Sequence, residues 1–175
     1  MLEKEEGGRI IGQGPHLAKL YSAVSWLTGR VLAVASQRND VLVLKGANIA
    51  AYGFGEGHPF GPDRHEVFHR ELAVRGAHNR VNLACATEAT HAELAAFHTR
   101  EHISRVETLC LAGSGWLDGG DTPARRGLDA AAAAVVGASI FAMEHIMAGH
   151  ARRAFVPIAG LHHAGRDHAA GFCIY

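Results

Sequence analysis

The sequence contains few cysteines and no excess charge of either sign. Its 175 residues include three cysteines, Cys85, Cys110 and Cys173, which are far apart and show no CxxC spacing. This pattern predicts a reduced, cytoplasmic chain without a disulfide framework. Lysine plus arginine and aspartate plus glutamate number 17 each, so the formal net charge is zero. A neutral chain provides no electrostatic reason to expect nucleic acid or an anionic membrane as a partner.

The sequence also lacks the features of a targeting peptide or a membrane span. Its acidic start, residues 1–6, has no positively charged region of the kind found in secretory or transit peptides. The one candidate span, residues 17–35, contains Lys19 and Arg30, whose charges oppose insertion into a bilayer. We therefore expect a soluble protein, long enough for one domain with a hydrophobic core.

The order of the apolar segments predicts an α/β fold. Strands are expected at 30–35, 41–44, 80–86 and 154–159, and helices at 16–27, 64–75, 90–97, 100–111 and 127–148. Glycines and prolines predict loops at 52–62 and 112–126, and glycines and charges predict a flexible leader at 1–14. Strands that alternate with helices favour a parallel sheet, in which functional residues gather beyond the carboxyl ends of the strands.

Thirteen histidines are unusual for this length, and two of them fit a metal-binding motif. Residues 65–69 read HEVFH, so His65 and His69 match the HExxH pattern of zinc proteases. Charged residues flank the motif on both sides, which is typical of a solvated helix. We therefore favour an amphipathic helix that buries Val67, Phe68 and Leu72, and keep the zinc protease as a minor alternative.

A second pair of histidines, His98 and His102, is also spaced by four residues. Residues 99–101 lie between them and are expected to mark a break between two helices. Packing or helix capping is therefore a better interpretation of this pair than metal binding.

Two adjacent histidines, His162 and His163, follow the last apolar segment. At the carboxyl end of a strand both imidazoles can reach one reacting group only if a tight turn follows, and Gly160 permits such a turn. Gly171 would allow a ligand to approach the backbone, and Phe172 could wall a narrow apolar channel. The alternative is a pair of loop histidines bound to backbone carbonyls.

The stretches around these histidines resemble a known family. The sequences GLHHA at 160–164 and AGFC at 170–173 resemble the active-site signature of histone deacetylases and of the bacterial acetoin-utilisation-type deacetylases. The stretches GHPFGPDR, FHT, GDTP and VGAS resemble further family motifs in the same order, at 57–64, 97–99, 120–123 and 136–139. The resemblance covers residues 41–175, whereas residues 1–40 form a leader of unknown role.

This resemblance implies a fold and an activity. The fold would be the three-layer α/β architecture of arginases and deacetylases, a parallel sheet flanked by helices, incomplete at its carboxyl side. Residues 41–175 would be the amino-terminal part of a zinc-dependent deacetylase domain. Such a domain hydrolyses the amide of acetyl-lysine or of an acetylated polyamine, which would be the partner of this site.

The resemblance also implies roles for the histidine pair. His163 would be the general base that takes a proton from a metal-bound water. His162 would stay protonated and would stabilise the oxyanion or protonate the leaving amine. Such a division requires environments that separate the two pKa values.

The same resemblance implies four residues around the substrate. Phe172 would line the tunnel for the acylated arm, and Gly171 would offer its carbonyl to the substrate amide. Asp121 would bind the substrate backbone at the rim, and Arg64 would lie by the channel through which acetate leaves. Without the resemblance, Asp121 would be an ordinary loop aspartate and Arg64 a surface charge at a helix start.

The zinc ligands that the resemblance implies are not identifiable in this chain. In the family an Asp-x-His pair and a further aspartate hold the metal, and all of them follow the GFC stretch. We therefore expect a truncated chain that is inactive alone. The alternative is a non-catalytic module that binds acylated ligands or a partner chain. An uncovered sheet edge would also favour self-association.

Overall fold

The computed structural model describes residues 40–55, 57–61, 63–158 and 162–175. The leader, the helix and the strand that the sequence predicts before residue 40 lie outside these residues, and so does Gly160.

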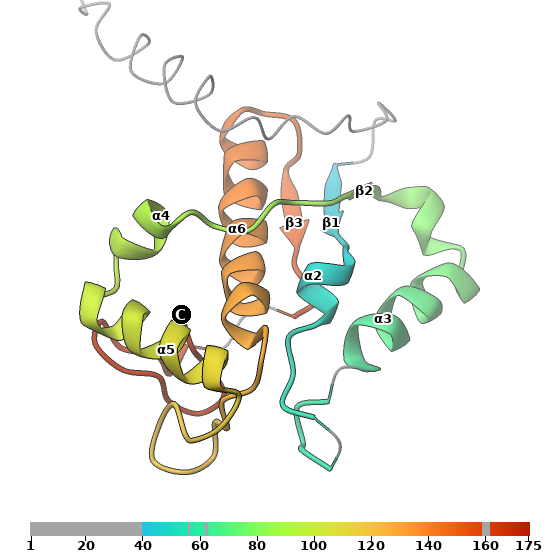
Figure 1. The fold of residues 1–175 in the computed structure, drawn as a ribbon. Helices are drawn as coiled ribbons and strands as arrows, with labels where there is room; N and C mark the ends of the chain where they lie inside the picture. Colours follow the sequence, from blue (N-terminus) through green and yellow to red (C-terminus); the bar gives the residue numbers. More distant parts are fainter. Residues whose placement is uncertain (1–39, 56, 62, 159–161) are drawn as a thin grey trace, which may run out of the picture. The chain divides into compact units, whose positions relative to one another are not determined.

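Three short parallel strands form the sheet of the described region (Figure 1). They lie in the order β2-β1-β3, with β1 at Val41–Leu44, β2 at Asn82–Ala84 and β3 at Arg153–Phe155. Val43, on the central strand, lies in register between Leu83 and Phe155. The prediction of a parallel α/β sheet is therefore confirmed.

Two strands are shorter than the sequence predicts. β2 covers three residues of the expected stretch 80–86, and β3 ends at Phe155 although the apolar run continues to residue 159. Pro157 explains the second difference, because proline has no N–H to donate to a neighbouring strand. The histidine pair therefore follows a loop and does not follow the strand directly.

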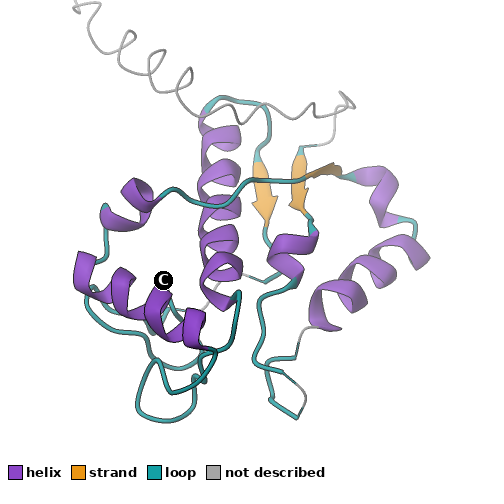
Figure 2. Cartoon of the chain, viewed as in Figure 1, coloured by secondary structure: helices purple, strands orange, loops and turns teal. Residues whose placement is uncertain are grey.

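The helix α6 (Leu128–Met147) covers one face of the sheet (Figure 2). Ala138 and Phe141 pack with Leu42 and Leu44 of β1, and small residues let helix and sheet approach closely. Among the described residues, α6 is the one helix long and apolar enough to cross a membrane. The core helix of a globular domain meets the same criterion, and nine residues of α6 are buried here.

The helix α3 (Asp63–Val74) lies against the opposite face. Ala154 packs with the α6 side of the sheet, so Phe155 points to the other side, where its ring lies 5.0 Å from that of Phe68. No residue of α3 is fully buried, and Val67 is 39% exposed. The prediction that this helix buries Val67 is therefore wrong, and Phe68 and Leu72 are only half-buried, because the short sheet offers α3 only a small surface.

The remaining helices precede α6 in the chain. They are α2 (Ala47–Ala50), the 3-10 helix η1 (Ala77–Arg80), α4 (His91–Ala95) and α5 (Arg100–Ala112). Thr90 and Glu93 form a capping box on α4, and the Thr99 side chain accepts a hydrogen bond from the His102 N–H at 3.2 Å to cap α5. The predicted break between two helices is confirmed, and His98 and His102 are both buried there.

Candidate functional site

A tight turn at residues 170–173 forms the centre of the candidate site. Ala170 and Cys173 exchange two backbone hydrogen bonds, of 2.9 and 3.0 Å, across the turn. The two central residues, Gly171 and Phe172, have φ angles of 53° and 68°. Positive φ at both positions matches a type I′ turn, which asparagine and glycine adopt readily and phenylalanine rarely does. Phe172 is the one described residue other than glycine with a positive φ, so its surroundings must hold it there.

Two hydroxyl groups hold the Phe172 backbone. The Phe172 N–H donates to the Thr122 Oγ1 at 3.0 Å, and its carbonyl accepts from the Tyr52 hydroxyl at 2.5 Å. Both side chains are buried. Arg125 in turn donates from Nε to the Gly53 carbonyl at 2.5 Å, which holds the loop that carries Tyr52. We call Tyr52 and Thr122 the backbone clamp of Phe172.

Asp118 fixes the clamp residue Thr122. Its Oδ1 accepts hydrogen bonds from the N–H groups of Gly120, Asp121 and Thr122 at 3.1, 3.1 and 2.9 Å, and its Oδ2 accepts from the Thr122 hydroxyl. Burial raises the pKa of Asp118, but hydrogen bonds from Asp121, Thr122 and the backbone outweigh burial and hold this pKa well below its usual range. The hydrogen bond to Asp118 raises the pKa of Asp121.

Three rings surround the Phe172 side chain. Its centroid lies 5.8 Å from that of Phe54, 4.7 Å from that of His58 and 6.4 Å from that of Phe60. The Phe60 N–H donates to His58 Nδ1 at 3.0 Å, so Nε2 carries the ring proton and donates to the Asp121 carbonyl at 3.2 Å. His58 therefore links the loop at 57–61 to the loop at 118–122.

The histidine pair lies beside the same turn. The His162 and His163 rings are exposed and contact each other at a tilt of 37°, with their centroids 4.7 Å apart. The His163 N–H lies 3.3 Å from the Cys173 Sγ, its acceptor. A Cβ on Gly171 would lie 2.9 Å from the His163 Cδ2, so only glycine allows this approach without a shift. The structure thus brings His163 together with Gly171 and its neighbours.

The other two predicted site residues reach the cluster from its edges. Asp121 is exposed, and its carbonyl accepts the hydrogen bond from His58. Arg64 is exposed at the start of α3, with its guanidinium 4.0 Å from the centroid of the Phe60 ring. Arg64 therefore contacts the aromatic cluster through Phe60 and is separated from Phe172 by that ring.

Sequence reasoning did not identify the residues that shape the turn. Tyr52, His58, Asp118 and Thr122 were assigned no role, although His58 and Thr122 lie inside the stretches that carry the resemblance. Tyr52 and Phe172 are 120 residues apart in the chain, so no local spacing could reveal their hydrogen bond.

The described residues do not form a zinc site. No group of three or more His, Cys, Asp or Glu side chains that could hold a metal ion occurs among them. His65 and His69 of the HExxH motif lie with ring centroids 4.4 Å apart, and neither Nε2 has a hydrogen-bond partner. Burial lowers the pKa of both imidazoles. Two imidazoles without a third ligand do not match a catalytic zinc site.

Comparison with known proteins identifies a family. Residues 58–175 match the family profile of the histone deacetylase domain. The chain is 31% identical over 146 residues to the acetoin utilization protein AcuC of Bacillus subtilis, covering 78% of this chain and 37% of AcuC. It is 30% identical to histone deacetylase RPD3 of Saccharomyces cerevisiae, covering 79% of this chain and 34% of that protein.

A solved structure shows the same fold. The HDA15 HD domain superposes with a TM-score of 0.70 at 27% identity, covering 78% of this chain and 40% of that one. The predicted deacetylase-type architecture, a parallel sheet with flanking helices, is therefore confirmed. The chain spans about a third of the length of the curated relatives it matches.

Proposed function

Because the chain belongs to the histone deacetylase family, whose members are generally zinc-dependent, we propose that it supplies the substrate-binding wall and the proton-transfer pair of a deacetylase site. One observation carries this proposal. The backbone clamp holds Phe172 at positive φ, and the same turn sets Gly171 against His163. Backbone conformations that cost this much energy are concentrated at functional sites, where the surrounding structure holds them in place.

The proposed substrate is an acetylated primary amine, either acetyl-lysine or an acetylated polyamine. The half-buried Phe172 ring packs edge-to-face with His58, with centroids 4.7 Å apart, and the apolar surface that it leaves exposed suits contact with an aliphatic arm of methylene groups. Gly171 has no side chain to keep a ligand from its backbone, so its carbonyl can accept a hydrogen bond from a substrate amide. Asp121, exposed on the adjoining loop, is the proposed contact for the substrate backbone, and Arg64 is proposed for the acetate product.

The histidine pair has the proposed acid–base role. His163 is the general base that takes a proton from water, and His162 stabilises the oxyanion or protonates the amine that leaves. Both imidazoles are exposed beside Gly171, within reach of an incoming ligand. Because the described residues form no zinc site, no step at the metal is assigned to them.

A binding experiment tests this proposal on the full 175-residue chain. An acetyl-lysine peptide and the same peptide with free lysine are titrated against the protein, and the imidazole and Phe172 ring signals are followed by NMR. The acetylated peptide should shift the His163 and Phe172 signals, and Phe172→Ala should weaken binding at least tenfold. The control is Phe155→Ala, because Phe155 is a half-exposed phenylalanine on the α3 side of the sheet. Equal responses to both peptides would contradict the proposal.

The lack of a three-ligand cluster among the described residues favours a second candidate, a module that binds acylated amines without hydrolysing them. Acetate release from the same peptide, in the presence of zinc, separates the two. Binding together with release supports the enzyme, whereas binding without release supports the module.

A further inference from the structure

The helix α3 carries a pair of histidines that the proposed function does not use. His65 and His69 are half-buried and four residues apart, and their ring centroids lie 4.4 Å from each other. The Nε2 atom of each ring is buried and has no hydrogen-bond partner. Buried polar atoms normally have a partner, so two such nitrogens on one face of a helix point to a bound water or ion.

The distance between the rings fits one metal ion bound by two neighbouring ligands. A metal about 2.0–2.1 Å from each Nε2 places the ring centroids about 4.5 Å apart when the two bonds meet at a right angle, and about 5.2 Å apart at the tetrahedral angle. The observed 4.4 Å therefore matches the right angle. Copper(II) and nickel(II) prefer this square or tetragonal arrangement of nitrogen and oxygen ligands, whereas zinc prefers the tetrahedral one.

The surroundings of the pair are apolar on one side and carry a positive charge nearby. The Phe68 ring lies 5.1 Å from that of His69 and 5.0 Å from that of Phe155. Such an apolar shell limits the access of water to a metal site. The charge of the exposed Lys45 also acts on His69 and would oppose a metal cation. Removal of this charge should therefore strengthen the binding of a cation.

α3 is a helix that gains from such a site. None of its residues is fully buried, so its packing contributes little to its stability. Residues four apart face the same side only while the turn between them is helical. A metal ion bound to both histidines would therefore stabilise the helical form of α3 by mass action.

We propose that His65 and His69 form a two-histidine site for a divalent transition-metal ion, with copper(II) bound most tightly. Water would complete the coordination, and the site would be structural. It is separate from the zinc site of the deacetylase family, and it does not rest on the acylated-amine substrate.

Other histidines among the described residues fit a metal less well. His98 and His102 also have buried nitrogens without a partner, but these side chains belong to residues that are 6% and 2% exposed, which closes them to an ion from solvent. The exposed His162 and His163 are the main competitors, and the second experiment below separates them from the α3 pair.

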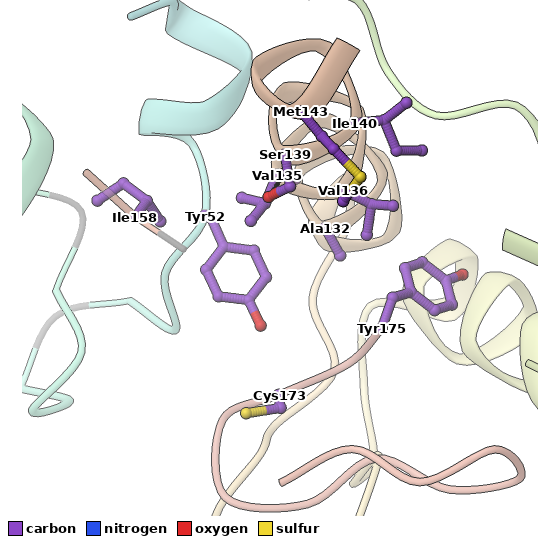
Figure 3. A pocket seen from close by; sticks show the side chains of 10 residues that line it. All are labelled: Tyr52, Ala132, Val135, Val136, Ser139, Ile140, Met143, Ile158, Cys173 and Tyr175. Atoms are coloured by element: carbon purple, nitrogen blue, oxygen red, sulfur yellow. Dashed lines mark hydrogen bonds between the residues drawn. The ribbon is translucent and has the colours of Figure 1, made fainter. Parts of the chain in front are cut away.

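The pocket beside α6 does not compete for the metal (Figure 3). It encloses about 220 Å³ and is lined by ten residues, with no imidazole or carboxylate among them. Its one thiol, that of Cys173, is buried and already accepts a hydrogen bond from the His163 N–H. The α3 pair therefore remains the better candidate for a divalent metal.

Calorimetric titration of the full chain with metal salts tests the proposal. Copper(II) should bind at least tenfold more tightly than zinc(II), following the general order of divalent-metal affinities. His65→Gln and His69→Gln should each weaken copper binding at least tenfold, and Lys45→Met should strengthen it about threefold. His78→Gln is the matched control, because His78 is an exposed histidine on η1. Equal losses at His69 and His78, or zinc binding as tight as copper binding, would overturn the proposal.

A second measurement does not depend on the fold of a variant. Copper(II) is paramagnetic and broadens the NMR signals of nearby protons. When copper is added to the unaltered chain in less than equimolar amount, the ring signals of His65 and His69 should broaden first. Broadening that begins at His162, His163 or any other histidine would overturn the proposal. Neither experiment contains an acylated peptide, so a failure here is distinct from a failure of the proposed function.

Discussion

At the scale of single residues, the candidate site depends on two neighbours with unusual backbone angles. Gly171 and Phe172 both adopt positive φ, and hydrogen bonds from residues far away in the chain hold them there. A left-handed phenylalanine costs energy that these contacts must offset. The site residues are therefore also residues on which local stability depends.

Gly171→Ala should destabilise the protein by about 1–3 kcal/mol, because a Cβ at positive φ is strained and would lie 2.9 Å from His163. Urea unfolding measures the free energy change. Gly119→Ala is the control, since Gly119 has no atom within 4 Å of the new Cβ and no positive φ. Equal effects at the two glycines would show that the turn does not require glycine.

Thr122→Val should cost about 1–3 kcal/mol, because it removes a buried hydroxyl that accepts from the Phe172 N–H and donates to Asp118. The Phe172 amide should then exchange its hydrogen faster with solvent. Hydrogen exchange followed by NMR measures this, and Thr108→Val, at an exposed position on α5, provides the comparison. Unchanged protection of the Phe172 amide would contradict the clamp.

At the scale of elements, the packing of α6 depends on its close approach to the segment between β2 and α4. Gly137 lies in the middle of α6, where a Cβ would be 2.1 Å from the Thr87 carbonyl oxygen and 2.7 Å from the Ala89 nitrogen. Backbone atoms cannot move away as a side chain can. The glycine therefore sets the distance between the helix and its neighbour.

Gly137→Ala tests this contact, because helix propensity and steric overlap predict changes in the free energy of unfolding of opposite sign. Helix propensity alone predicts a gain of about 1 kcal/mol for alanine over glycine in a helix interior. The steric overlap predicts a loss of about 1–3 kcal/mol instead. Thermal unfolding measured by circular dichroism decides between them, and a higher melting temperature would show that α6 does not pack as described.

At the scale of the whole molecule, buried and half-buried histidines connect folding to pH. Burial is the first cause that lowers the pKa of His65, His69, His98 and His145. For His98, the nearby His102 and Arg166 lower it further. A lowered pKa means that the folded state binds these protons less readily than the unfolded state.

The free energy of unfolding should therefore be highest above pH 6.5, the ordinary pKa of histidine, and should fall as the pH decreases through the lowered values. Urea unfolding between pH 8 and pH 5 measures this dependence. His98→Asn should reduce the slope, and His78→Gln, at an exposed histidine, should leave it unchanged. A free energy of unfolding that rises as the pH decreases would contradict the lowered pKa values of these histidines in the folded state.

Local patterns in the sequence were sufficient to predict much of the fold. Alternating apolar segments predicted β1, α4, α5 and α6, because strands and helices reflect periodic contacts between near neighbours. The helix predicted from Thr90 and the break predicted at residues 99–101 coincide with capped helix starts, because caps act within three residues. The motif around His162 and His163 indicated the family, which the match over residues 58–175 confirms.

Only the tertiary structure decided how the site is held together. The partners of Phe172, the hydroxyls of Tyr52 and Thr122, lie 120 and 50 residues away in the chain, and no periodicity encodes contacts at such separations. Burial of Val67 failed as a prediction because it depends on how much sheet surface faces α3. The sequence alone determined the main helices, the central strand and the family of this protein. The tertiary structure decided which backbone is strained, which hydroxyls hold it, and which imidazole nitrogens are left without a hydrogen-bond partner, because these properties arise from atoms brought together by the whole fold.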